Sequence, residues 1–153
     1  MKISVPRLTT KMARFIFGKS GHSLLVDSSN FIYRKEGSDK KCTKDYYECV
    51  ERKQLKCRAR VHTSFEAVEI IKRTAEHSHL ADLAKLNKRE GLSGLYKTSE
   101  VSIAAPRVLI AETVSNMDDA AQSKLPNYQS MSRHIRRIRQ KIEGAPPVPM
   151  VKI

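Results

Sequence analysis

Short apolar runs separated by polar turn residues fill the first half of the chain. Three of them are centred on Ile16, Leu25 and Ile32, and residues rich in Gly, Ser, Asn and Asp follow. Runs of this length, repeated at intervals of about ten residues, predict a compact antiparallel sheet. The expected strands cover residues 15–17, 24–26, 31–33, 46–50, 54–63 and 67–75, with turns at 18–21 and 27–30 and a polar loop at 37–41.

The hydrophobic spacing changes after His79 and becomes helical. A first helix is expected from Leu80 to Gly91, and Pro106 stands where a second helix over 108–114 can begin. The strongest helical pattern covers residues 127–143, between Pro126 and Gly144. Its apolar stripe consists of Met131, Ile135, Ile138 and Ile142, and its opposite side carries Arg133, Arg136, Arg137 and Lys141.

These patterns predict an α+β protein, in which a small antiparallel sheet is followed by two to three helices. We expect a flexible basic arm over residues 1–12, a sheet domain over 13–79, a helical region over 80–143 and a disordered tail over 144–153.

The charge is strongly basic and unevenly distributed. The 153 residues hold 29 Lys and Arg against 16 Asp and Glu, a net charge of +13. Residues 1–79 hold 17 bases against 9 acids, residues 80–125 hold 6 of each, and residues 126–153 hold 6 against 1. Two basic modules thus flank a neutral spacer. This pattern favours a polyanionic partner, namely DNA, RNA or an anionic surface, over an ordinary solvated surface.

Neither a membrane span nor a secretory leader is expected. The best apolar run, 103–111, contains Pro106 and Arg107 and falls short of the roughly 18 residues that a span needs. The N-terminal residues lack an apolar stretch of the kind found in signal peptides. We therefore expect a reducing compartment, in which the three cysteines serve as thiolates or buried thiols and not as disulfides.

Two cysteines and two histidines have a spacing that suits a metal ion. Cys49, Cys57, His77 and His79 form the pattern C-x7-C-x19-H-x-H, and a tetrahedral structural zinc site requires four such ligands. In an extended strand the two histidines would share a face and Ser78 would point away. The alternative is a pair of buried thiols beside polar histidines. A sheet of about 65 residues has a thin core, and one structural Zn²⁺, which supplies about 10–16 kcal/mol, would stabilise it.

The sheet domain resembles the FLYWCH-type zinc finger, which is named for Phe, Leu, Tyr, Trp, Cys and His. The positions that carry the likeness are Phe15, Leu25, Tyr33, Tyr47, Cys49, Cys57, His77 and His79. The segment from Lys56 to Val61 is similar to the Cys-Arg/Lys-Ala-Arg strand of that family. Tyr47 stands where the family has Trp, and the sequence Tyr-Tyr-Glu-Cys is close to the Tyr-Tyr-Arg-Cys of the related plant WRKY domains.

This resemblance covers about residues 13–79. It implies a sheet of four to five antiparallel strands with zinc at one end, and a DNA-binding role. Residues 80–143 look like the helical segment that follows such fingers in transcription-factor and mutator-like transposase relatives. This likeness rests on Leu125-Pro126, before the last helix, and on the Arg-rich sequence of that helix.

The candidate DNA contacts are all basic residues. Arg34 and Lys35 lie where the WRKY relatives carry their reading strand, so we expect them to contact bases. The expected phosphate contacts are Lys40, Lys41 and Lys44. The second choices are Arg58 and Arg60, and the alternative is that these two only solvate the open face of the sheet. The last helix carries four further bases, which either bind phosphate, act as a nuclear-import signal, or form a solvated helix face. They are Arg133, Arg136, Arg137 and Lys141.

Two function classes remain. The first is a nuclear, zinc-dependent protein that binds double-stranded DNA, either a transcription or chromatin regulator or the domesticated DNA-binding part of a transposon. The second is an adaptor in which the zinc sheet is a scaffold and the helices dock a protein partner through the Met131–Ile142 stripe. The chain lacks a Gly-rich phosphate loop, a Gly-x-Ser-x-Gly elbow and a His-Glu-x-x-His helix, so we expect neither an enzyme nor a small-molecule substrate.

Overall fold

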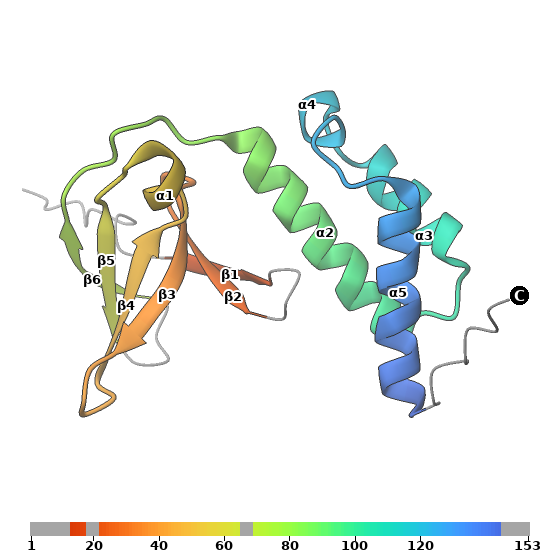
Figure 1. Ribbon diagram of the computed structural model, residues 1–153, viewed down its shortest axis with the longest axis horizontal. Helices are drawn as coiled ribbons and strands as arrows, with labels where there is room; N and C mark the ends of the chain where they lie inside the picture. The colour runs from red at the N-terminus through yellow and green to blue at the C-terminus, as the bar shows by residue number, and fades with distance from the viewer. Residues whose placement is uncertain (1–12, 18–21, 65–68, 145–153) are drawn as a thin grey trace, which may run out of the picture. The chain divides into compact units, whose positions relative to one another are not determined.

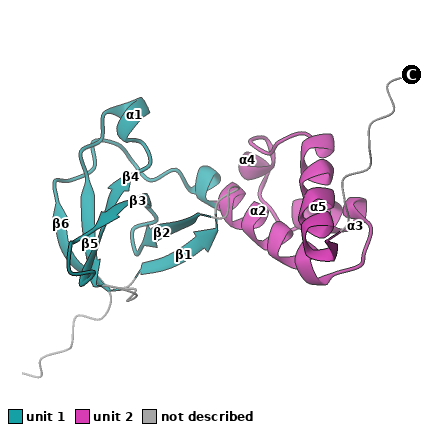
Figure 2. Ribbon diagram, turned by 60° about the horizontal axis from the view of Figure 1, so that its bottom comes forward, with its two compact units in different colours: residues 1–86 teal, residues 87–153 magenta. Residues whose placement is uncertain are grey.

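A computed structural model describes residues 13–17, 22–64 and 69–144 (Figure 1). The expected arm over 1–12, the turn at 18–21 and all of the expected tail except Gly144 lie outside the described residues. The chain divides into two compact units, residues 1–86 and 87–153 (Figure 2).

The first unit is a six-stranded sheet in which each strand pairs antiparallel with the next one along the chain. The predicted α+β class is confirmed. The apolar runs indicate six strands and the sheet has six, whereas the resemblance implies four to five. The strands are β1 (Ala13–Phe17), β2 (Ser23–Asp27), β3 (Ile32–Ser38), β4 (Lys44–Cys49), β5 (Arg60–Ser64) and β6 (Ile70–Thr74).

The connection between β4 and β5 differs from the expectation. Residues Arg52–Leu55 form a short helix, α1, and Lys56 adopts a left-handed conformation with φ of 55°. The prediction of a strand from Gln54 to Thr63 is therefore wrong at its start, because β5 begins only at Arg60. The Arg-Lys-Gln-Leu segment consists of good helix formers, and one helical turn reverses the chain between two antiparallel strands.

The sheet buries a different cluster on each face. From residue 57 to residue 63, the side chains alternate between buried and more exposed positions, as the sequence predicts. One cluster packs Leu25, Tyr33, Tyr47 and Val61 together with the cysteines at positions 49 and 57. Tyr47, which stands where the FLYWCH-type finger has Trp, is thus a core residue. The cluster on the other face consists of Ile16, Leu24, Val26, Ile32 and Leu86.

The helices are α2 (Leu83–Val101), α3 (Pro106–Ser115), α4 (Asp119–Gln122) and α5 (Tyr128–Glu143). The expected end of the first helix at Gly91 is wrong, since α2 continues through Gly91 and Gly94. The Met117 side chain lies 2.9 Å from the place where a Cβ on Gly91 would stand. Gly91 therefore permits close packing instead of ending the helix. None of the described helices is long and apolar enough to cross a membrane.

The second unit has a core of its own. Leu95, Leu109 and Ile110 pack with Met131 and Ile135 from the apolar stripe of α5. Ile142, at the far end of that stripe, is 58% exposed. The first half of the predicted stripe thus contacts the other helices of its own unit.

Both ends of α5 are capped, and its C-terminal end at Gly144 is the one that the sequence predicts. The Asn127 side chain accepts a hydrogen bond of 2.8 Å from the backbone N–H of Ser130, and Gly144 takes a left-handed φ of 65°.

We expect Asn127→Ala to destabilise the second unit by about 1 kcal/mol, because it leaves one backbone donor of the first turn without a partner. Chemical denaturation followed by the helical circular dichroism signal measures this loss. Gln129→Ala, an exposed change in the same turn, is the matched control and should leave the midpoint unchanged. Equal midpoints for the two variants would contradict the cap.

Candidate metal centre

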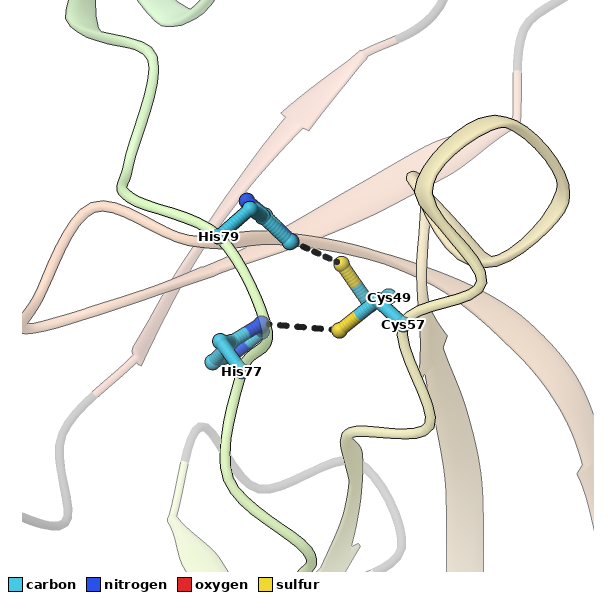
Figure 3. A group of neighbouring side chains, drawn as sticks. All are labelled: Cys49, Cys57, His77 and His79. Carbon is cyan, nitrogen blue, oxygen red and sulfur yellow. Dashed lines mark hydrogen bonds between the residues drawn. The ribbon is translucent and has the colours of Figure 1, made fainter.

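Four side chains converge beside the sheet, where three separate segments meet (Figure 3). Cys49 is the last residue of β4, and Cys57 lies between α1 and β5. His77 and His79 follow β6 in an irregular segment, so the expectation that they stand in a strand is wrong. Strand β6 ends at Thr74, and Ala75 has a φ of 61°, which turns the chain toward the cysteines.

The distances between these four ligand atoms suit one zinc ion. The Cys49 sulfur lies 3.3 Å from Nε2 of His79, and the Cys57 sulfur lies 3.4 Å from Nδ1 of His77. All four ligand atoms lie within 4.8 Å of one another. In a tetrahedral site with Zn–S of about 2.3 Å and Zn–N of about 2.1 Å, sulfur and nitrogen stand about 3.6 Å apart. Cys49, Cys57, His77 and His79 are therefore positioned to bind one zinc ion.

Burial opposes ionisation of both cysteines, so a pair of thiolates here requires a nearby cation. Burial raises the pKa of Cys49 to about 12, and the neighbouring Cys57 adds to the rise. Burial acts on Cys57 in the same direction, but hydrogen bonds from the backbone N–H groups of Ala59 and Ser78 lower its pKa overall. Two buried thiolates repel each other unless a cation lies between them, and zinc supplies that charge.

His77 is held as a neutral ring. Burial lowers its pKa to about 4, and the nearby His79 lowers it further. A neutral imidazole is the form that binds metal. Phe31 stacks on His77, with ring centroids 3.5 Å apart and planes at 4°. His79 places its Nδ1 2.8 Å from the carbonyl oxygen of Leu80, which leaves Nε2 directed at Cys49.

The predicted base-reading pair does not share one face of the sheet. Neighbouring residues of a strand point to opposite sides. Arg34 stands opposite Glu48 in the register of β3 and β4 and forms an ion pair of 2.5 Å with it. Lys35 instead forms an ion pair of 3.0 Å with Asp45. A duplex on one face of the sheet therefore meets only one of the two.

The face that carries Arg34 continues across β4 and β5. Arg60 is opposite Glu48 in the register and lies 3.1 Å from Glu36. Arg52, at the start of α1, also contacts Glu48. Burial alone would raise the pKa of Glu48, but its hydrogen bonds with Arg52 and Arg34 lower it overall. The carboxylates thus fix the arginine side chains in place.

A basic patch lies at the outer part of this face. It consists of Lys44, Arg60, His62 and Lys72, and the register pairs His62 of β5 with Tyr46 of β4 and Lys72 of β6. Burial lowers the pKa of His62, the positive charges of Lys72, Lys44 and Arg60 lower it further, and Glu36 acts in the opposite direction. Three positively charged side chains thus lie near His62 on this face. Sequence reasoning missed Lys72 and Arg52; pairing the predicted strands in register would have found Lys72.

The turn between β3 and β4 presents two further lysines. The Asp39 carboxylate accepts hydrogen bonds from Thr43, through its backbone N–H and its hydroxyl at 2.6 Å each, and from the backbone N–H of Lys44 at 3.1 Å. These bonds fix the turn. Lys40 and Lys41 are exposed on it and form no ion pair among the described residues.

The remaining predicted contacts lie on exposed surfaces. Arg58 is exposed beside Cys57. In the second unit, Arg133, Arg136, Arg137 and Lys141 are exposed on α5. Arg139, a base of the same helix that was not among the predicted contacts, has another role. Its guanidinium donates hydrogen bonds of 2.8 Å and 2.7 Å to the carbonyl oxygens of Ser102 and Ala104 after α2.

Comparison with known proteins agrees with this geometry. A protein-family model described as the FLYWCH zinc finger domain matches residues 15–79. The match contains all four metal-ligand positions. No curated protein matches the chain.

Proposed function

We propose that the FLYWCH zinc finger domain at residues 15–79 binds double-stranded DNA in a zinc-dependent manner, and that the protein is a nuclear transcription or chromatin regulator or the domesticated DNA-binding part of a transposon. In this proposal the zinc ion is structural: it holds the sheet together, and the sheet presents the basic side chains to the duplex.

The observation that carries this proposal is the basic patch. Three cations and His62 lie on one face of the sheet, close enough together for the cations to lower the pKa of the histidine. Lys40 and Lys41 extend the positive surface along the β3–β4 turn. A cluster of bases on one face of a small domain is the electrostatic footprint of a nucleic-acid interface.

Arg34 is the best candidate for a base contact. Its ion pair with Glu48 orders the guanidinium on the same face as the patch. An ordered arginine donates two parallel hydrogen bonds to guanine in the major groove, and the carboxylate beside it limits where the arginine points. A β-sheet that enters the major groove provides the geometry for such a contact.

The α5 bases supply a second surface in the same proposal. Arg133, Arg136 and Arg137 are exposed, and a helix of this kind binds backbone phosphate without reading the sequence. The competing adaptor function is less well supported. It needs the apolar stripe of α5 to be free, whereas Met131 and Ile135 are buried in the core of their own unit.

The proposal assigns no catalysis to the zinc centre. A catalytic zinc keeps one coordination position open for water or substrate. Here the four protein ligands would occupy all four positions of a tetrahedral zinc ion.

The experiment that tests this function is a titration of the full chain with a fluorescent 20-base-pair duplex, at several salt concentrations. We expect affinity in the presence of zinc, a steep fall of log K with log salt, and loss of binding after zinc is removed. Salt-independent binding, or equal binding with and without zinc, would refute the proposal.

We expect Arg34→Ala to relax the preference at one base pair, at a cost of about 1–3 kcal/mol for the preferred sequence. Lys41→Ala should weaken all duplexes about equally, because it removes a phosphate contact. Lys35→Ala, which removes a cation from the opposite face of the same strand, is the control and should leave the preference unchanged. Affinities for a panel of single-base variants measure all three. A uniform loss for Arg34→Ala would mean that another strand reads the sequence.

A further inference from the structure

His77 contacts a chain of buried polar groups on the side of its ring that faces away from Cys57. Its Nε2 lies 2.7 Å from the hydroxyl oxygen of Tyr33, and that hydroxyl lies 2.9 Å from Oδ2 of Asp27. Arg73 donates to the same oxygen at 2.8 Å. Tyr33 and Asp27 are each 1% exposed. These groups therefore contact one another directly, without a bridging water molecule.

The direction of each hydrogen bond follows from the number of hydrogens available. The second oxygen of Asp27 accepts bonds of 3.0 Å from the backbone N–H groups of Ser29 and Phe31. Asp27 is the acceptor in every one of its hydrogen bonds, including the bond from Arg73. The single hydrogen of the Tyr33 hydroxyl therefore points to Asp27. The hydroxyl oxygen must then accept from His77, so Nε2 of His77 carries the hydrogen.

We propose that Tyr33, oriented by Asp27 and Arg73, is a positioning residue that selects Nδ1 of His77 as the nitrogen that binds zinc. Outer partners that take the second N–H of a metal-bound histidine fix its tautomer and its ring orientation. Nδ1 is the nitrogen that lies 3.4 Å from the Cys57 sulfur, so the chosen tautomer directs its lone pair toward the cysteines.

This chain also connects the metal centre to three strands. Asp27 ends β2, Tyr33 stands in β3 and Arg73 stands in β6, whereas the cysteines belong to β4 and to the segment before β5. Zinc affinity therefore depends on the packing of strands that contribute no ligand.

The test compares the full-length wild type with Tyr33→Phe, by competition for zinc with a chromogenic chelator. We expect Tyr33→Phe to weaken zinc binding by about 10- to 100-fold. Tyr47→Phe is the matched control, since Tyr47 is a buried tyrosine of the same cluster whose hydroxyl contacts no described ligand residue. Its affinity should match that of the wild type. Equal zinc affinities for all three chains would overturn the proposal.

A second measurement needs no variant and is independent of whether Tyr33→Phe folds. Long-range ¹H–¹⁵N spectra of the zinc-loaded wild type identify which nitrogen of each histidine is protonated. We expect His77 to be protonated at Nε2 and metal-bound at Nδ1, and His79 to show the opposite arrangement. Metal binding through Nε2 of His77 would overturn the proposal.

Discussion

We expect Cys57→Ser to leave the sheet domain unfolded, so that its cooperative melting transition is lost. The Cys57 side chain is fully buried beside Cys49, in a core cluster that includes Tyr33 and Tyr47. Removal of the thiolate forfeits zinc binding energy of about 10 kcal/mol, which exceeds the whole stability expected of so small a domain. Amide spectra of the strands and thermal melts with and without chelator measure the loss.

The second unit makes this prediction specific. Its helices pack around their own cluster of Leu95, Leu109, Ile110, Met131 and Ile135, so their circular dichroism signal should persist when the sheet unfolds. Cys42→Ser is the matched control, because Cys42 is an exposed cysteine outside the metal centre. It should melt like the wild type. If Cys57→Ser melts like the wild type, and chelator does not change its melting temperature, the sheet does not depend on zinc.

We expect the triple substitution Lys40→Ala, Lys41→Ala and Lys44→Ala to weaken duplex binding by about 10- to 100-fold at ~0.15 M salt. All three lysines are exposed at the β3–β4 turn or the start of β4, and none forms an ion pair with a described residue. The slope of log K against log salt should become shallower by about 2–3, since each lost phosphate contact lowers it by about 0.9.

A charge-matched variant separates a local interface from general attraction. Lys53 in α1 and two bases of the second unit, Lys97 and Arg107, are exposed and lie outside this turn in the sequence. Their joint replacement by Ala removes the same charge. This control should keep the wild-type slope within error. If both triple variants lose affinity and slope equally, the binding is diffuse and the β3–β4 turn is not the interface.

Features set by local sequence were predictable. Pro126, the periodic stripe and Gly144 predict α5 with nearly correct bounds, because each acts within a few residues. Strand alternation likewise predicts that one face carries Cys57, Ala59, Val61 and Thr63, and all four are buried. The four zinc ligands could be identified because Cys and His in two pairs are rare outside metal sites.

Features set by contacts between distant segments were not predictable. The start of β5 at Arg60, later than the expected strand start at Gln54, depends on its pairing with β4 and β6. The ion pairs of Arg34 and Lys35 depend on strand register, which places their carboxylate partners in β4. The contact of Tyr33 with His77 joins residues 44 positions apart, and no spacing in the sequence indicates it.

The measurement that tests the central claim most directly is selection from a random duplex library at ~0.15 M salt, with the zinc-loaded wild type and Cys57→Ser side by side. The zinc-dependent DNA-binding function predicts a recovered sequence motif for the wild type and none for the variant. Recovery of nothing above background with the wild type, or of the same motif with Cys57→Ser, would contradict it.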